Sequence, residues 1–190
     1  MTSDLLTSEF IPLSTYAQAA RRQDQRLRIG IAWASINDKH RPIDEKFVPL
    51  KDFLSTVDGV EADFVSLQRN LEVADPARFL PKFVRLLPCD VLEAKNETSL
   101  HKLVEEIREL DCVVTISTTT THIAASLGVP VELIAAERTG HQWFWQVQAN
   151  HRKHFYPTVT VHLGNGETGK WWERCLKSVK DSLSDLKRVK

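Results

Sequence analysis

The sequence is poor in cysteine, with three among its 190 residues, at positions 89, 112 and 175. Their number is odd, their spacing is wide, and no two have the Cys-x-x-Cys spacing of a metal or redox site. A disulfide framework or a structural zinc site is therefore not expected. Cys112 lies in an apolar run and is expected to be a small buried residue of a strand.

The sequence also lacks an excess of charge of either sign. It has 25 Lys and Arg residues against 25 Asp and Glu residues, so the formal net charge is zero. A nucleic-acid interface or an attraction to an anionic membrane surface normally requires a basic excess. We therefore expect neither kind of partner.

No apolar run has the length of a membrane span. The first ten residues, MTSDLLTSEF, contain acidic residues and no basic segment, unlike a secretory signal. The expected compartment is the cytoplasm. With 190 residues, of which 42% are hydrophobic, the chain has the size and composition of one globular domain with a short extra arm.

The most informative segment is 111–130, DCVVTISTTTTHIAASLGVP. Residues 112–116 predict a strand buried on both faces, five hydroxyl residues follow, and 122–127 predict a short helix ended by Gly128 and Pro130. A hydroxyl-rich turn at a helix N-terminus offers N–H and O–H donors, which suits phosphate groups. The same hydroxyls would also cap the helix, although one suffices for a cap. Both interpretations stay open.

The fold class predicted from the whole chain is α/β: a Rossmann-like parallel sheet with helices on both faces, because strands alternate with helices. The expected strands are 27–33, 62–67, 91–92, 112–116, 129–135 and 158–163. The expected helices are 43–57, a helix capped by Asn96 or Thr98 and ending near 110, 122–127 and 167–187. Residues 1–26 are predicted to be an arm or linker, and 27–190 the domain itself.

Polar loops follow four of the predicted strands, at 35–41, 68–70, 117–122 and 137–145. Ligands of parallel α/β sheets bind at the carboxyl edge, where these loops would gather. The aromatic pair Trp143 and Trp145 is expected to pack in the core or at an interface rather than to stack on a nucleotide base. Asp111 precedes its strand, so it lies at the other edge and is not expected to be catalytic.

Four segments in order resemble one glycosyltransferase family: LRIGIAWAS, DKHRPID, VSLQ and DCVVTISTTTTHIAASLGVPV. The family is the heptosyltransferase-like family 9 of GT-B glycosyltransferases, and the likeness is to its C-terminal, donor-binding lobe, especially the form associated with tetratricopeptide repeats. The family motif V-I-S-V-D-T-x-x-x-H-L-A-x-x-L-G-x-P-V is matched at Thr118, His122 and 127–131. The segments 143–145 and 154–158 resemble the family's W-x-W and W-Y-P-S/T stretches. The resemblance covers about residues 27–187.

This resemblance implies one Rossmann-like lobe of a GT-B enzyme that binds a nucleoside-diphosphate sugar, such as an ADP- or UDP-sugar. Lys39 matches the family lysine that contacts the donor phosphates, and the helix N-terminus at 118–121 would donate N–H groups to them. No metal and no cofactor is implied, and no catalytic residue is assigned. The predicted donor-binding residues are Ser35, Asn37, Lys39, Gln68, Ser117, Thr118, Thr119 and His122.

Two features depart from the family pattern. Ser117 stands where the family has an aspartate, and Thr119 where it has Gly or Ala. The acceptor lobe with its catalytic base lies in the N-terminal half of the family, where this chain has only the 26-residue arm. Two hypotheses remain: a donor lobe whose acceptor lobe is missing or supplied elsewhere, for instance by a tetratricopeptide-repeat partner, or an inactive glycosyltransferase-fold domain that serves as a binding or protein-interaction module. The chain as a fragment of a longer enzyme is a third possibility.

Overall fold

The computed structural model describes residues 26–36, 42–69, 81–82, 84–88, 91–92, 95–137, 145, 156–164 and 170–186; side chains at 36 and 42–45 are excepted. The predicted arm, residues 1–26, lies outside these ranges except for its last residue. Its boundary with the domain therefore stays a prediction.

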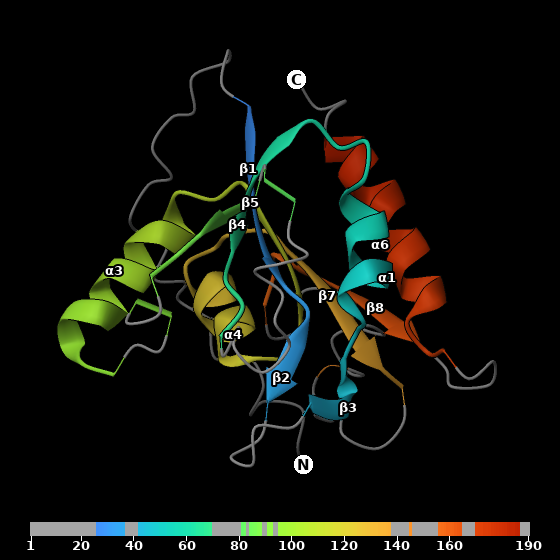
Figure 1. The fold of residues 1–190 in the computed structure, drawn as a ribbon, viewed down its shortest axis with the longest axis horizontal. Coiled ribbons are helices and arrows are strands. Elements are labelled where there is room, and N and C mark those ends of the chain that lie inside the picture. Colours follow the sequence, from blue (N-terminus) through green and yellow to red (C-terminus); the bar gives the residue numbers. More distant parts are fainter. Residues whose placement is uncertain are drawn as a thin grey trace, which may run out of the picture.

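A six-stranded parallel sheet forms the centre of the domain (Figure 1). Its strands are β1 (Leu27–Ala32), β4 (Ala62–Ser66), β5 (Val84–Leu86), β6 (Cys112–Ile116), β7 (Val131–Ala136) and β8 (Val159–Gly164). Their order is β5-β4-β1-β6-β7-β8. The chain builds outward from β1 to β5, returns to place β6 beside β1, and then builds outward to β8. This is the doubly wound order, and its switch point lies between β1 and β6. The predicted fold class is confirmed.

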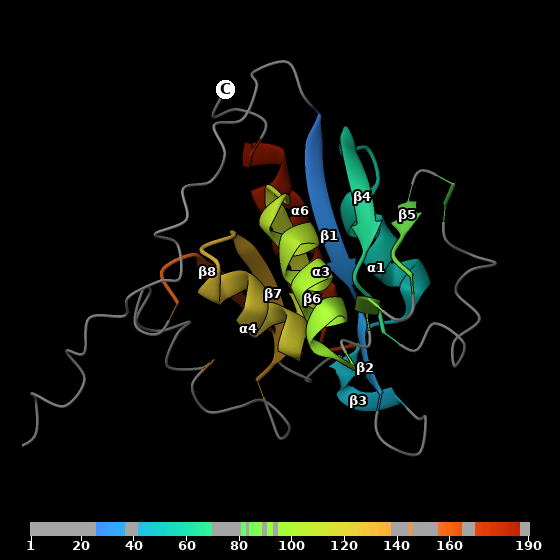
Figure 2. The same cartoon turned by 90° about the vertical axis from the view of Figure 1, so that its left-hand side faces the viewer.

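Helices cover both faces of the sheet. The helices α1 (Leu50–Val57) and α6 (Glu173–Leu186) lie together on one face, and α3 (Glu97–Arg108) and α4 (Thr119–Ser126) cover the other (Figures 1 and 2). Each face has its own apolar core, because side chains alternate along a strand. Phe53 and Val179 belong to the first core, and Leu103 and Ile107 to the second. All five residues of β6 are buried, as expected for a central parallel strand.

The ends of α3 and α4 follow from their local sequence. At the start of α3, Asn96 Oδ1 accepts a hydrogen bond of 2.9 Å from the Ser99 N–H, and Ser99 Oγ accepts one of 3.2 Å from the Asn96 N–H. Asn96 is thus the cap, not Thr98. After α4, Gly128 has a φ of +77°, a conformation that costs glycine little, and Pro130 follows.

The predicted helix 43–57 is wrong in its first half. Residues Pro42–Phe47 form β3, which pairs antiparallel with β2 (Ala34–Ile36) in a hairpin beyond the carboxyl end of β1 (Figure 1). The helical spacing of Phe47, Leu50 and Phe53 suggested one continuous helix. Pro49 prevents this because it favours an extended conformation at Val48, whose N–H donates to the Trp33 carbonyl at 2.9 Å.

The predicted strand at 91–92 is also wrong. These two residues are helical, and their N–H groups both donate to the carbonyl of Pro88. The strand at this edge of the sheet is β5 instead, and the segment around it shows no clear apolar period. A strand of three residues is too short for its alternation to be recognised.

Two of the three cysteines are described, and both are buried free thiols. Burial raises the pKa of Cys112 far above its usual range and that of Cys175 to about 12. Both therefore act as small core residues, as the sequence predicted for Cys112. Within the described ranges, no set of three His, Cys, Asp or Glu residues is placed to hold a metal ion. The helices described include none long and apolar enough to cross a membrane.

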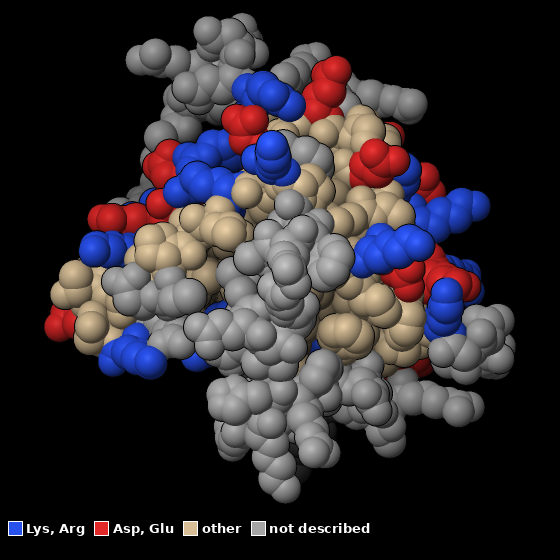
Figure 3. Space-filling view, in the orientation of Figure 1, with Lys and Arg blue, Asp and Glu red and all other residues tan. Residues whose placement is uncertain are grey.

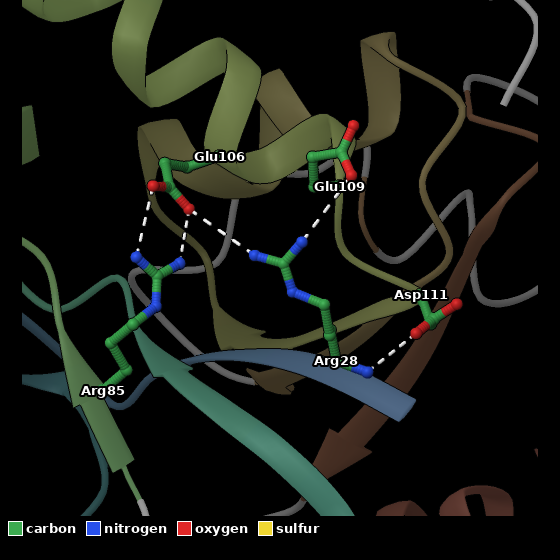
Figure 4. Close-up of polar contacts among 5 residues, drawn as sticks. All are labelled: Arg28, Arg85, Glu106, Glu109 and Asp111. Carbon is green, nitrogen blue, oxygen red and sulfur yellow. Dashed lines mark hydrogen bonds and ion pairs between the residues drawn. The ribbon is translucent and has the colours of Figure 1, made fainter. Parts of the chain in front are cut away.

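An ion-pair network lies at the amino edge of the sheet (Figure 4). Arg85 on β5 binds Glu106 on α3 through both guanidinium NH groups, and Arg28 on β1 approaches Glu106 at 3.7 Å and Glu109 at 3.6 Å. Asp111 accepts the Arg28 N–H at 2.7 Å and so lies at this edge, as predicted. The described part of the face in Figure 3 shows basic and acidic side chains interspersed in the same way.

Glu106→Gln is expected to lower the free energy of unfolding by about 0.5 kcal/mol at pH 7, because the pairs are partly exposed to solvent. The hydrogen bond from Arg85 lowers the pKa of Glu106 in the folded state. The stabilisation from this hydrogen bond is therefore present above the pKa of Glu106 in the unfolded state, about 4.3, and is lost as the pH falls through the lower pKa of the folded state. Urea unfolding at pH 7 and at pH 3 tests this. The control is Glu105→Gln on the same helix, which should not change the free energy of unfolding at either pH. An equal loss for Glu106→Gln at both pH values would contradict the role assigned to Glu106.

Candidate functional site

The turn between β6 and α4 lies at the carboxyl edge of the sheet, beside the switch point. The backbone of Thr118 is extended, with φ −135° and ψ 172°, and its N–H donates to Thr121 Oγ1 at 3.2 Å. The Thr121 hydroxyl in turn donates to the Ile116 carbonyl at 2.8 Å, which ties the first turn of the helix to the end of the strand. One of the five hydroxyls therefore closes the turn. The N–H groups of Thr119 and Thr120 are among those that a helix leaves without an intrahelical partner.

The other hydroxyls of this turn are used differently. Ser117 is buried, and its Oγ accepts a hydrogen bond of 2.8 Å from Trp145 Nε1. The Thr118 Oγ1 atom is buried and faces the Thr121 N–H in a capping-box arrangement, but that N–H donates to the Thr118 carbonyl at 3.1 Å and Oγ1 makes no hydrogen bond among the described residues. Thr119 is exposed. A buried hydroxyl beside unpaired helix N–H groups is a polar position that a ligand oxygen would satisfy.

An aromatic cluster borders this turn. His122 on α4 stacks on Trp145, with ring centroids 5.2 Å apart and 23° between the planes, and its Nδ1 lies 3.0 Å from the hydroxyl oxygen of Tyr156. The Tyr156 ring also packs against the Trp145 ring, with ring centroids 5.9 Å apart. Trp145 is fully buried, so it packs in the core as predicted. His122 and Tyr156 are half-buried and form the accessible part of the cluster.

Gln68 lies one strand away, after β4, and its amide is fully engaged. Its Oε1 accepts from the N–H groups of Trp33 at 2.9 Å and Ala34 at 2.8 Å, and its Nε2 donates to the carbonyls of Ala34 and Arg69, both at 2.8 Å. An amide offers two acceptor lone pairs and two donor hydrogens, and all four are used. Gln68 thus fixes the backbone that leads from β1 into Ser35.

A second polar chain lies under α6, away from this turn. His162 Nε2 on β8 contacts Glu132 Oε2 on β7 at 2.5 Å, and His162 Nδ1 lies 2.9 Å from Ser178 Oγ on α6. A serine, a histidine and a carboxylate in sequence resemble a nucleophilic triad. Ser178 sits in mid-helix, however, where backbone N–H groups are engaged in the helix, so none is available to stabilise an oxyanion. We interpret these contacts among Glu132, His162 and Ser178 as a structural link between β7, β8 and α6.

A hollow of about 400 Å³ lies between α3 and the segment after β5. Its lining is apolar at Leu87, Pro88 and Val91, and charged at Arg28, Lys102 and three glutamates, two on α3 and one directly after it. Arg28 is paired with two of those glutamates. The hollow therefore offers a ligand no strong charge of one sign.

Comparisons with known proteins bear on the fold. No protein-family model and no curated protein matches the sequence. Among solved structures, the chain is similar to ADP-heptose LPS heptosyltransferase II of E. coli, with a TM-score of 0.52, 16% identity, and coverage of 86% of this chain and 48% of that one. The chain has the Rossmann-like fold of a GT-B lobe. It spans about half the length of that heptosyltransferase.

Two further structures align less well. An FMN-dependent NADH-azoreductase from Bacillus anthracis gives a TM-score of 0.41 at 13% identity, over 84% of this chain and 99% of that one. The wall teichoic acid polymerase TagF gives 0.38 at 11% identity, over 86% of this chain and 37% of that one. Both scores are too low to carry an argument about this GT-B-like lobe.

The predicted site residues fall into three groups in the GT-B-like lobe. Four lie together in the β6–α4 turn and the first turns of α4: Ser117, Thr118, Thr119 and His122. Gln68 and the half-buried Ser35 lie at the same edge, because β1 pairs with both β4 and β6. Asn37 and Lys39 lie outside the described residues. An association with tetratricopeptide repeats stays a prediction.

Tyr156 is the site residue that the sequence did not assign. It contacts His122 across 34 residues of chain, and no spacing within a single element reveals such a contact. The one available signal was its place directly before a predicted strand, in the segment that resembles the family's W-Y-P stretch.

Proposed function

We propose that this GT-B-like lobe binds a nucleoside-diphosphate sugar at the β6–α4 turn and takes part in glycosyl transfer, with the acceptor base supplied from outside residues 27–190. The observation that carries the proposal is the turn itself: helix N–H groups without an intrahelical partner and the buried Thr118 hydroxyl, which makes no hydrogen bond among the described residues, meet at the switch point of a parallel sheet. The sequence resemblance supplies the choice of ligand.

The reaction breaks the bond between the anomeric carbon and the diphosphate oxygen, so negative charge develops on the leaving phosphate. Donors fixed beside that oxygen would stabilise the developing charge. A helix N-terminus contributes about 0.3–1 kcal/mol, whereas millimolar binding requires about 4 kcal/mol. The ammonium of Lys39, which follows β2 in the sequence, and packing of the base would supply the difference.

Calorimetric titration with ADP, UDP, GDP and their sugars tests the proposal on the full chain. We expect one nucleotide to bind with a Kd between micromolar and low millimolar. Lys39→Ala should weaken that binding about tenfold or more, and Thr118→Val, which removes one hydroxyl while keeping the shape, about fivefold.

Thr158→Val is the matched control. The Thr158 Oγ1 atom is likewise buried without a partner among the described residues, but it precedes β8 at the opposite edge of the sheet. It should leave nucleotide affinity unchanged. Absence of binding by any nucleotide to the folded protein would overturn the proposal.

One observation favours a second candidate, a non-catalytic binding or protein-interaction module. Ser117, at the position of the family aspartate, and Gln68 both use their polar atoms within the protein. Gln68 is then not available to orient a sugar, and Ser117 has one acceptor position already used. A folded protein that binds none of the nucleotides would support this candidate.

A further inference from the structure

The amide of Gln68 binds the backbone at the point where β1 leaves the sheet. Just past the last paired residues of β1 and β4, the Leu67 N–H still donates to the Ile31 carbonyl at 2.9 Å. At the next position, Gln68 Oε1 accepts the N–H groups of Trp33 and Ala34, and Nε2 donates to the Ala34 carbonyl. A side-chain amide has the same donor and acceptor groups as a peptide. It therefore satisfies this backbone while the chain turns out of the sheet.

These hydrogen bonds also fix the base of the β2–β3 hairpin. The Trp33 carbonyl accepts the N–H of Val48, the residue directly after β3, at 2.9 Å. Together with the bonds from Gln68, this bond pairs the N–H and the carbonyl of two consecutive residues, 33 and 34. Trp33, Ala34 and Gln68 are all less than a tenth exposed. Because buried polar groups need partners, the bonds set the direction in which the hairpin leaves β1.

The hairpin lies beside the β6–α4 turn. Ala32 of β1 lies opposite Thr115 of β6 in the sheet. Three residues further along each chain are Ser35 of the hairpin and Thr118 of the turn. The second strand of the hairpin, β3, contacts β7, which lies on the far side of β6 from β1. The hairpin therefore spans the carboxyl end of β6, where the turn begins.

We propose that Gln68 is a positioning residue for the ligand site: its amide sets the direction of the hairpin, and the hairpin forms one side of the nucleoside-diphosphate site at the β6–α4 turn. This inference rests on the proposed function. Gln68 itself does not contact the ligand, because all four hydrogen-bonding positions of its amide are used within the protein. It acts on the ligand through Lys39, which stands among the five residues that join β2 to β3.

The backbone part of the inference can be tested without a ligand. Gln68→Met keeps the length of the side chain and removes all four hydrogen bonds. We expect hydrogen exchange at the Trp33 and Ala34 amides to become about tenfold faster relative to exchange at the Leu67 amide, which donates to Ile31 instead. Equal increases at the three amides would show an effect on global stability alone and would overturn the inference.

Nucleotide titration tests the effect of Gln68 on the ligand site. Gln68→Met should weaken nucleotide binding about fivefold, because Lys39 is then held less well beside the phosphates. The matched control is Glu132→Ala, which also removes a buried polar partner but lies beneath α6. It should leave nucleotide affinity unchanged. Equal losses of affinity in the two variants would contradict a specific role of Gln68.

A double-mutant cycle shows whether Gln68 acts through the hairpin. When Lys39→Ala is already present, Gln68→Met should weaken binding by less than about twofold. When Thr118→Val is present instead, Gln68→Met should still weaken binding about fivefold. A full effect in both backgrounds would overturn the inference, because Gln68 would then act independently of the hairpin.

The same titrations separate this inference from the proposed function. If no nucleotide binds the wild-type protein, the proposed function fails and the positioning role fails with it. If a nucleotide binds and Gln68→Met leaves its affinity unchanged, the proposed function stands and the positioning role fails.

Discussion

Gln68→Ala is expected to lower the free energy of unfolding by about 3 kcal/mol. The change removes the partners of two buried N–H groups, those of Trp33 and Ala34, and of the Ala34 carbonyl. Each buried polar group left without a partner costs about 1–3 kcal/mol, although water entering the space left by the side chain would recover part of that cost. Urea or thermal unfolding measures the loss, which corresponds to a decrease in Tm of about 6–12 °C for a chain of this size.

Arg69→Ala is the control for this change, because Arg69 is adjacent and exposed. It should alter the free energy of unfolding by less than about 0.5 kcal/mol. If Gln68→Ala were equally mild and instead abolished nucleotide binding, the amide would serve the ligand and not the backbone. That result would contradict the role assigned to Gln68.

Glu132→Ala is expected to cost about 3 kcal/mol of the free energy of unfolding. Glu132 and His162 are both less than a tenth exposed, and their contact of 2.5 Å links two neighbouring strands beneath α6. Removing the carboxylate leaves a buried imidazole N–H without its acceptor and opens a cavity. Losing one partner of a buried pair typically costs about 3–5 kcal/mol.

Glu132→Gln separates the hydrogen bond from the charge. The glutamine oxygen can still accept from His162, so the loss should fall to about 1 kcal/mol. Ser178→Ala removes the exposed hydroxyl that contacts His162, and it should lower the free energy of unfolding by less than about 1 kcal/mol. A cost below 1 kcal/mol for Glu132→Ala would mean that the pair contributes little, and the assigned link between β7, β8 and α6 would be wrong.

Five of the six strands of the sheet, all but β5, could be predicted because their signal is local. A few neighbouring residues suffice to predict the strand at Cys112–Ile116 and the helix end at Gly128 and Pro130, and the structure confirms both predictions. The hairpin β2–β3 could not be predicted from such patterns. Its second strand has apolar residues that continue at helical spacing into α1, and both the pairing with β2 and Pro49 keep it out of the helix.

The candidate site could be located from the sequence, but its internal contacts could not. The β6–α4 turn was found because strand, hydroxyl run and helix are consecutive. The partners that define the roles of Gln68, Ser117 and His122 lie 28 to 35 residues away in the chain. A sequence pattern gives the type of a side chain but not its partner. A buried Gln bonded to backbone and a Gln available for a ligand therefore look identical until the fold is known.

Mapping of backbone amide resonances during nucleotide titration tests the central claim most directly. We expect the largest shifts at residues 118–122 and at the end of β1, with the amides of Arg28 and Asp111 at the amino edge unchanged. Shifts confined to the amino edge or to the α1–α6 face, or no shifts with any of the nucleotides, would contradict a nucleotide site at the β6–α4 turn.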